Sequence, residues 1–309
     1  MEGLVIKSTG GSYIVRISDG SKIECRLKGK FKIQGIKATN PIAVGDRVEF
    51  TIMPDNVGQI SEIKERFNYI IRKATNLSKS THVLAANIDN AYLIATLAQP
   101  RTSTGFIDRF LVTAEAYHIP AIILINKKDL LTDEQLIAAK ELLEMYDRIG
   151  YRGKIISSFD PKDTEELSEE LKGKINLFSG HSGVGKSSLI NSIDPRFHLK
   201  VENISAYHKK GIHTTTFAEM HELSNGSFII DTPGIKEFGL TDFLKEEVAL
   251  YFPEMKELLS RCQFYNCTHQ HEPRCAVKEA LQSGQISVSR YSNYIGIMKD
   301  EYFNENEWD

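Results

Sequence analysis

Residues 180–187 read Gly-His-Ser-Gly-Val-Gly-Lys-Ser and match the pattern G-x-x-x-x-G-K-[ST] of phosphate-binding loops. An apolar run at residues 175–178 precedes this stretch, and a helix-forming run at residues 188–191 follows it. A strand, a glycine-rich loop and a helix in this order turn backbone N–H groups and the positive helix end toward phosphate oxygens. The alternative is a glycine-rich turn with an accidental lysine, and the flanking strand and helix disfavour it. We therefore predict a phosphate loop (P-loop).

Two side chains of this loop have distinct expected roles. Lys186 is expected to reach the β and γ phosphates of a nucleotide and to take part in catalysis. Ser187 is expected to offer its hydroxyl to the Mg²⁺ ion that bridges the same phosphates. The residues of this stretch that we expect to contact the nucleotide are Gly180, His181, Ser182, Gly183, Val184, Gly185, Lys186, Ser187 and Ser188.

The chain on either side of the loop alternates between apolar strands and helical patterns. Strands are predicted at residues 89–96, 121–125, 174–179 and 227–230, and helices at residues 107–117 and 133–146. This alternation is typical of an α/β domain with a twisted, mainly parallel sheet.

A second motif follows the predicted strand at residues 121–125. It consists of Asn126, Lys127, Lys128 and Asp129 and resembles the guanine-recognition motif N-K-x-D. The Asp129 carboxylate can accept from both the ring N–H and the exocyclic amine of guanine, whereas adenine presents the wrong donors. Asn126 and the stem of Lys127 are expected to support the loop and cover the base. Such a string alone is more often a surface turn, but beside a P-loop it indicates a guanine nucleotide and argues against an ATPase or a metabolic kinase.

Three weaker motifs complete the predicted nucleotide site. Asp231 and Gly234 belong to a D-x-x-G element at the end of a predicted strand, where Asp231 would hold Mg²⁺ through water. Thr215 and Thr216 lie in the predicted switch segment, and one hydroxyl there would complete the metal shell. Ser157 and Ser158 resemble the last GTPase motif, which supports the base with main-chain groups, although the pair alone would be an ordinary loop.

The first seventy residues read as short alternating strands separated by turn residues. The predicted strands are 4–8, 13–18, 23–27, 47–52 and 59–63. Five short strands favour a small barrel of OB type, and an SH3-like barrel is the alternative. Residues 1–80 carry 14 Lys and Arg against 8 Asp and Glu, although the whole chain has a formal net charge of -3. Any basic face that binds nucleic acid is therefore expected at the front of the chain.

Near the other end, three cysteines and a histidine are closely spaced. Cys262, Cys267, His269 and Cys275 offer three thiolates and one imidazole, which is a complete tetrahedral set for Zn²⁺ with no open position. A structural zinc ion is therefore predicted. The spacing alone leaves His271 as a competing ligand. Cys25 stands apart from the cluster and is expected to be a small core residue.

Composition excludes several classes of protein. The longest apolar runs are far shorter than the roughly 20 residues that span a bilayer, so no transmembrane helix and no membrane partner are expected. The first residues show no secretory pattern, and the clustered cysteines do not indicate a disulfide scaffold, so a cytoplasmic location is expected. Nothing indicates an obligate dimer, and a monomer is expected.

The order of the nucleotide motifs is permuted. Residues 126–129 precede the P-loop by about fifty residues, whereas in ordinary small GTPases N-K-x-D comes last. Together with the barrel and the cysteine cluster, this order resembles the RsgA (YjeQ) family of GTPases that act in small ribosomal subunit biogenesis, over nearly the whole chain. The prediction is a multidomain α/β protein with an OB-type β-barrel at residues 1–72, a circularly permuted P-loop GTPase domain at 73–240 and a helical zinc-binding domain at 241–309.

The resemblance also implies a function. It implies a GTP hydrolase that binds the small (30S) ribosomal subunit and its rRNA, assists late maturation and is stimulated by the subunit. It favours His269 as the fourth zinc ligand. The surplus lysines of the barrel are candidates for rRNA contact, although basic loops are often only solvated; they are Lys28, Lys30, Lys32 and Lys37.

The expected mechanism needs an external partner. Small GTPases place a glutamine after D-x-x-G to position the attacking water, but this chain has Ile235 there. His213 in the switch segment is the candidate that positions water once the subunit orders the segment, and simple packing of His213 is the alternative. Ile235 also fits a second hypothesis, a GTP-dependent adaptor that docks on RNA and in which hydrolysis is incidental.

Overall fold

A computed structural model of the chain describes residues 1–27, 41–73, 81–197, 219–231 and 245–299. The chain divides into two compact units, which we describe separately. Unit 1 comprises Met1–Tyr92, Ser158–Ser179 and Gly185–Glu237. Unit 2 comprises Leu93–Ser157, Gly180–Val184 and Phe238–Asp309.

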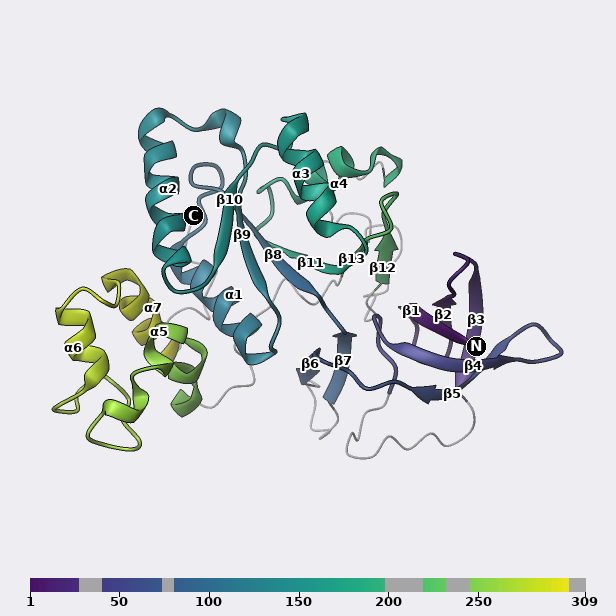
Figure 1. Ribbon diagram of the computed structural model, residues 1–309, viewed down its shortest axis with the longest axis horizontal. Helices are drawn as coiled ribbons and strands as arrows, with labels where there is room; N and C mark the ends of the chain where they lie inside the picture. Colours follow the sequence, from purple (N-terminus) through teal and green to yellow (C-terminus); the bar gives the residue numbers. More distant parts are fainter. Residues whose placement is uncertain (28–40, 74–80, 198–218, 232–244, 300–309) are drawn as a thin grey trace. The chain divides into compact units, whose positions relative to one another are not determined.

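Unit 1 begins with a closed five-stranded barrel (Figure 1). Its strands are β1 (Glu2–Ser8), β2 (Tyr13–Arg16), β3 (Lys22–Leu27), β4 (Arg47–Ile52) and β5 (Gly58–Ile63). They are hydrogen-bonded in the order β1-β2-β3-β5-β4, and β4 pairs again with β1. Alternate side chains such as Val15, Phe50 and Ile60 are buried inside. The prediction of an OB-type barrel is confirmed, and the SH3-like alternative is set aside.

A small antiparallel sheet follows the barrel in unit 1. It consists of β6 (Tyr69–Lys73) and β7 (Thr81–Ala86). The sequence pattern did not predict these two strands. The expected domain boundary at residue 72 falls within β6, and β7 lies beyond it. The three domain ranges stay a prediction.

The α/β part of unit 1 carries the strand that leads into the P-loop. Its elements are α3 (Pro161–Leu171), β11 (Ile175–Ser179), α4 (Lys186–Ile193), β12 (Glu219–Glu222) and β13 (Phe228–Asp231). Strands β11 and β13 run parallel, and β12 is antiparallel to β13. β12 also pairs with β1 of the barrel at Lys7 and Glu219. The barrel and this sheet are therefore joined by backbone hydrogen bonds.

Unit 2 contains the strands that lead into the predicted base-recognition motifs. Its elements up to residue 157 are β8 (Asn90–Ala95), which starts in unit 1, α1 (Thr104–Ala116), β9 (Ala121–Ile125), α2 (Asp133–Asp147) and β10 (Arg152–Ile155). Strands β9 and β10 are parallel, and β8 lies on the other side of β9. Every residue of β8 is buried, as in strands covered on both faces. Both helices begin at a capping side chain, Ser103 for α1 and Thr132 for α2.

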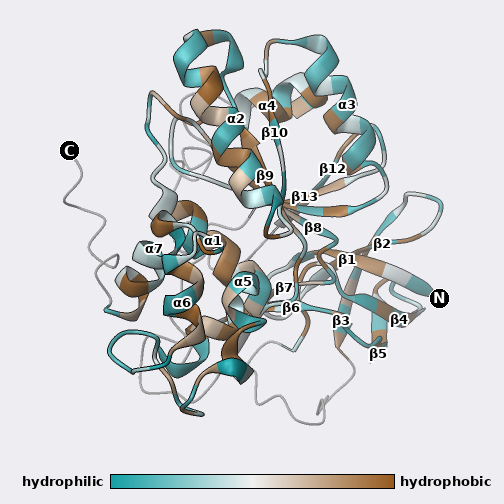
Figure 2. Ribbon diagram, turned by 60° about the vertical axis from the view of Figure 1, so that its left-hand side comes forward, coloured by the Kyte–Doolittle hydropathy of each residue, from teal (hydrophilic) through white to brown (hydrophobic). Residues whose placement is uncertain are grey.

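The C-terminal helices of unit 2 share a hydrophobic core with α1, against which α7 packs directly. They are α5 (Pro253–Lys256), α6 (Ala276–Gln282) and α7 (Val288–Met298). Val112 of α1 belongs to the same buried cluster as Phe252, Met255, Tyr294 and Ile297. Figure 2 shows apolar residues along both α1 and α7. One hydrophobic core therefore holds α1 and the C-terminal helices together.

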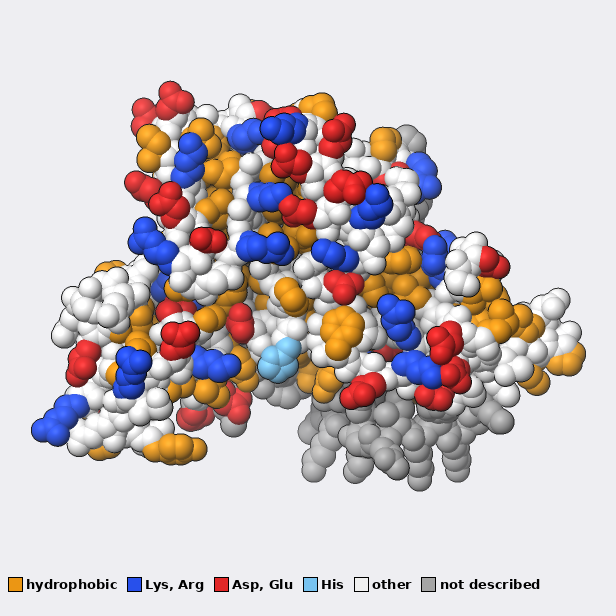
Figure 3. All heavy atoms as spheres, viewed as in Figure 1, with side chains coloured by type: hydrophobic (Ala, Val, Ile, Leu, Met, Phe, Trp, Pro, Cys, Tyr) orange, Lys and Arg blue, Asp and Glu red, His pale blue; other side chains and the backbone are white. Residues whose placement is uncertain are grey.

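The described surface mixes charges of both signs. On the face shown in Figure 3, Lys and Arg side chains are interspersed with Asp and Glu side chains. Within the part of the chain that the structure describes, no helix combines the length and the apolar character needed to cross a bilayer.

Candidate nucleotide-binding site and metal centre

The phosphate loop starts immediately after β11 ends at Ser179. Gly180 has a φ of 142°, and a Cβ atom there would lie 2.2 Å from the backbone oxygen of Ile94, so glycine is required. Gly185 has a φ of 96° and caps α4, whose first residues are Lys186 and Ser187. Since the first N–H groups of a helix have no intrahelical acceptor, this helix start can bind anionic oxygens.

Asp231 lies at the end of a strand beside β11. It is the last residue of β13, which pairs with β11 in parallel so that Ile230 is opposite Leu177. The two strands therefore end at the same edge, the edge at which open α/β sheets bind ligands.

Several predicted residues lie outside the described residues: the site residues His213, Thr215, Thr216 and Gly234, as well as Ile235 and the four barrel lysines.

Asn126 connects the predicted guanine-recognition segment to the phosphate loop inside unit 2. It directly follows β9 and is fully buried. Its side-chain amide donates a hydrogen bond of 2.9 Å to the backbone oxygen of Val184, which is 58 residues further along the chain. Its backbone N–H donates to the oxygen of Ala95 at 2.8 Å. The two strongest sequence motifs are therefore in direct contact.

The two lysines of the motif contact neighbouring loops. Lys127 adopts a left-handed conformation with a φ of 65°, and its Nζ donates to the backbone oxygen of Gln99 at 2.6 Å. The backbone N–H of Lys128 donates to the oxygen of Ile156 at 3.0 Å. The segment is thus tied to the loops that follow β8 and β10.

Asp129 is oriented by a serine from the loop after β10. The buried Ser157 donates its hydroxyl to the Asp129 carboxylate. This bond holds in place the carboxylate that is predicted to read guanine. In unit 1, the backbone oxygen of Ser158 accepts a 2.6 Å bond from the Ser192 hydroxyl of α4. The sequence predicts that Ser157 and Ser158 act through main-chain groups, and it does not predict the side-chain contact of Ser157.

The loop between β8 and α1 also touches the phosphate loop, although no motif marked it in the sequence. The Phe106 ring stacks on His181 with the ring centroids 3.8 Å apart and an interplanar angle of 31°. Pro100 faces Gly183, where a Cβ atom would lie 3.4 Å from the proline Cδ. The only available signal was the position of this loop after a strand's carboxyl end.

The cysteine cluster has the composition and spacing of a metal centre. The ligand atoms of Cys262, Cys267, His269 and Cys275 all lie within 4.8 Å of one another. Nδ1 of His269 is 3.7 Å from Sγ of Cys262 and 3.3 Å from Sγ of Cys275. A tetrahedral zinc ion with ordinary bond lengths places nitrogen and sulfur about 3.5 Å apart. His271, the competing ligand, is exposed.

Burial shifts the pKa values of the cysteine and histidine side chains in opposite directions. Burial raises the pKa of the Cys267 thiol to about 12 and raises the pKa of Cys275 as well, while it lowers the pKa of His269. The imidazole is therefore neutral and able to donate a lone pair to a metal. The thiols stay protonated near neutral pH unless a bound cation stabilises the thiolates.

Two family models match the chain. One, described as the RsgA GTPase, matches residues 63–241. The other, described as the RsgA N-terminal domain, matches residues 2–60. The first match alone covers more than half of the chain.

Relatives and solved structures agree with these matches. A small ribosomal subunit biogenesis GTPase RsgA from Christiangramia forsetii is 52% identical and covers 97% of this chain and 96% of its own length. The protein of the same name from Bacteroides fragilis is 49% identical and covers 97% of both chains. The crystal structure of YjeQ from Thermotoga maritima has a TM-score of 0.79 at 36% identity and covers 97% of both chains. YloQ, described as a circularly permuted GTPase, has a TM-score of 0.74 at 33% identity and covers 99% of this chain and 96% of its own.

Proposed function

Because this chain belongs to the RsgA GTPase family, we propose that it hydrolyses GTP on the small (30S) ribosomal subunit and assists the late maturation of that subunit. The relatives carry this activity in their name, small ribosomal subunit biogenesis GTPase. The proposal that the chain binds GTP is supported most directly by the buried hydrogen bond from Asn126 to Val184. This bond holds the guanine-recognition segment against the phosphate loop. In this proposal the chain acts as a monomer in the cytoplasm, where subunits mature.

The roles of the individual residues in GTP binding are part of this proposal. Asp129, oriented by Ser157, accepts from the guanine ring N–H and amine. The backbone N–H groups of the loop and the Lys186 ammonium bind the phosphates and stabilise the charge that develops on them during transfer. Ser187 and Asp231 would hold Mg²⁺, which neutralises phosphate charge when it is bound.

Hydrolysis is expected to depend on the subunit. Since Ile235 cannot orient water, the isolated chain should turn over slowly. Purified small subunits should raise kcat at least about tenfold, although by less than the roughly 10³- to 10⁵-fold effect of an arginine finger. Phosphate release with small subunits, with large subunits and with neither measures this effect.

The matched control is Lys186→Ala, which should remove the stimulated turnover. Equal turnover with and without small subunits would contradict the proposal and favour the adaptor hypothesis.

We further propose that the cysteine cluster binds one structural Zn²⁺ ion. Cys262, Cys267, His269 and Cys275 would hold it with no open position, so zinc takes no part in GTP chemistry. Its contribution is to the stability of a segment rich in loops. Binding of rRNA by the barrel lysines is also part of the proposal.

A further inference from the structure

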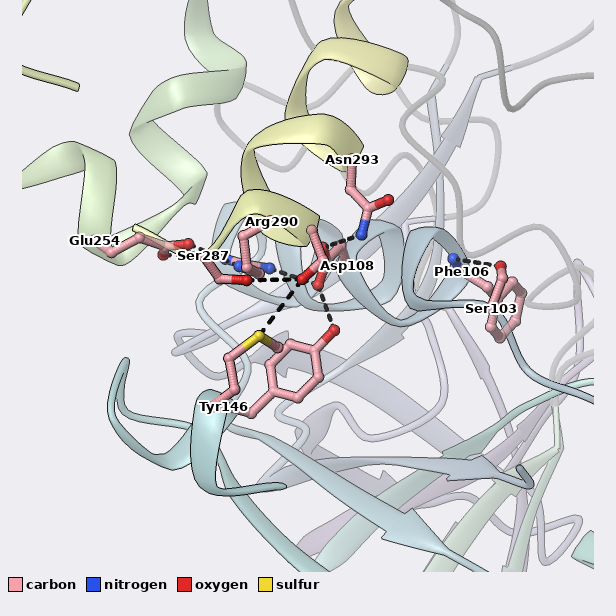
Figure 4. A network of polar contacts seen from close by, with 10 residues as sticks. Ser103, Phe106, Asp108, Tyr146, Glu254, Ser287, Arg290 and Asn293 are labelled. Carbon is pink, nitrogen blue, oxygen red and sulfur yellow. Dashed lines mark hydrogen bonds and ion pairs between the residues drawn. The ribbon is translucent and has the colours of Figure 1, made fainter. Parts of the chain in front are cut away.

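A buried charge network joins the C-terminal helix α7 to α1 within unit 2. Nη1 of Arg290 donates to Asp108 at 2.7 Å, and Nδ2 of Asn293 donates to the same carboxylate at 2.6 Å. The Tyr146 hydroxyl of α2 donates to Asp108 at 2.7 Å, and Arg290 also pairs with Glu254 at 2.7 Å. Figure 4 shows Arg290 and Asn293 pointing from α7 toward Asp108 in α1.

Burying this network costs desolvation free energy that a purely apolar contact would avoid. Asp108 is 0% exposed and Arg290 is 1% exposed, so both charges are fully removed from water. Apolar side chains of similar volume often stabilise a buried position at least as well as such an ion pair. Unlike apolar contacts, the charged hydrogen bonds of Arg290 and Asp108 form only in one relative orientation, so they fix the register of α7 on α1.

The opposite face of α1 touches the phosphate loop. Phe106 precedes Asp108 by two residues, which places the two side chains about 200° apart around the helix. Phe106 stacks on His181, the second residue of the P-loop. Its backbone N–H is fixed by the capping hydroxyl of Ser103 at 3.2 Å. Helix α1 therefore lies between α7 and the phosphate loop, with Asp108 on one side and Phe106 on the other.

Two tyrosines of α7 contact the backbone of the cysteine cluster. The Tyr291 hydroxyl donates to the backbone oxygen of His269 at 2.7 Å, and the Tyr294 hydroxyl donates to that of Thr268 at 2.9 Å. A displacement of the cluster would therefore move α7, and through Asp108 it would move α1. An unbroken series of directional contacts runs from the cluster to the phosphate loop.

We propose that α7 controls nucleotide affinity through α1, with Asp108 and Phe106 as positioning residues for the phosphate loop. The proposal rests on the proposed function, because it concerns the regulation of the same nucleotide site. Its consequence is that a macromolecule that binds the cysteine-cluster segment alters GDP and GTP affinity without touching the nucleotide.

The test is a double-mutant cycle on GDP affinity, measured by fluorescence titration of the full chain without ribosomes. Asp108→Asn keeps the shape of the side chain and removes its charge. It should weaken GDP binding about 3- to 10-fold. Phe106→Leu should weaken GDP binding by a similar factor. Phe106→Tyr keeps the aromatic ring and should bind GDP as tightly as the wild type does. In the Phe106→Leu background, Asp108→Asn should have no further effect, because the link to the loop is already broken.

The matched control is Asp46→Asn in the barrel. Asp46 is also 0% exposed and pairs at 2.6 Å with Arg66, whose side chain is 8% exposed. This variant loses the same kind of ion pair and should bind GDP as the wild type does. If Asp108→Asn does not fold, Asn293→Ala takes its place, since it removes a single hydrogen bond to Asp108.

Three results would overturn the proposal: unchanged GDP affinity in Asp108→Asn, additive losses in the double variant, or an equal loss in Asp46→Asn. A wild-type chain that does not bind GDP at all would instead refute the proposed function.

Discussion

Replacing Asp129 with asparagine is expected to lower the affinity for GDP roughly 100- to 1000-fold. The wild-type carboxylate would accept two charge-assisted hydrogen bonds from guanine. The asparagine amide would keep one acceptor and place a donor against a donor of the base. Xanthine carries a carbonyl where guanine carries the amine, so the variant should gain affinity for xanthosine diphosphate. Competition titrations with GDP, XDP and ADP measure both changes.

A nearby aspartate provides the control for this substitution. Asp133, in the first turn of α2, is exposed and follows the motif by four residues. Asp133→Asn makes the same change of charge and should leave the order of preference unchanged. Unaltered preference for GDP in Asp129→Asn would refute the assignment of Asp129 to the base.

Replacing Cys275 with alanine is expected to abolish zinc binding and to destabilise the C-terminal part of unit 2. Three remaining ligands hold zinc far more weakly than four, and the ion contributes to folding directly. We expect the free energy of unfolding to fall by about 5 kcal/mol. This is less than the roughly 10–16 kcal/mol that zinc binding contributes to the folding of isolated zinc fingers, because the core shared with α1 remains. Metal analysis and chemical unfolding measure the two effects.

Cys25 serves as the control for this experiment. It is buried like Cys275 but lies in the barrel, outside the cluster. Cys25→Ala should retain about one zinc ion per chain while losing some core packing. Absence of zinc in the purified wild type, or full retention in Cys275→Ala, would contradict the metal assignment.

Much of this structure could be predicted from local sequence patterns, because these patterns do not depend on contacts between distant segments. The alternation in the first seventy residues predicted the barrel strands, and the run 121–125 matches β9. Residues 126–129 and 180–187 could be predicted to bind a nucleotide because both the turn geometry and the chemistry of these motifs constrain the same few positions, and their roles stay a prediction. The spacing of the three cysteines likewise predicted a cluster of metal ligands, although it left His269 and His271 as alternatives.

Contacts between distant segments could not be predicted in this way. The pairing of β1 with β12 joins positions more than two hundred residues apart, and neither strand signals its partner. Asp108 and Arg290 are 182 residues apart, and each reads as an ordinary surface charge on a helix. The stacking of Phe106 on His181 depends on how α1 packs, which a single sequence does not encode locally.

The most direct test of the central claim is a crystal structure of the chain with GDP and Mg²⁺. The permuted motifs are predicted to bind one and the same nucleotide. The guanine edge should then lie within hydrogen-bond distance of the Asp129 carboxylate, and the β-phosphate should contact Lys186 and the backbone N–H groups of residues 183–187. A nucleotide bound elsewhere, or one held by Lys186 with its base away from Asp129, would contradict the account.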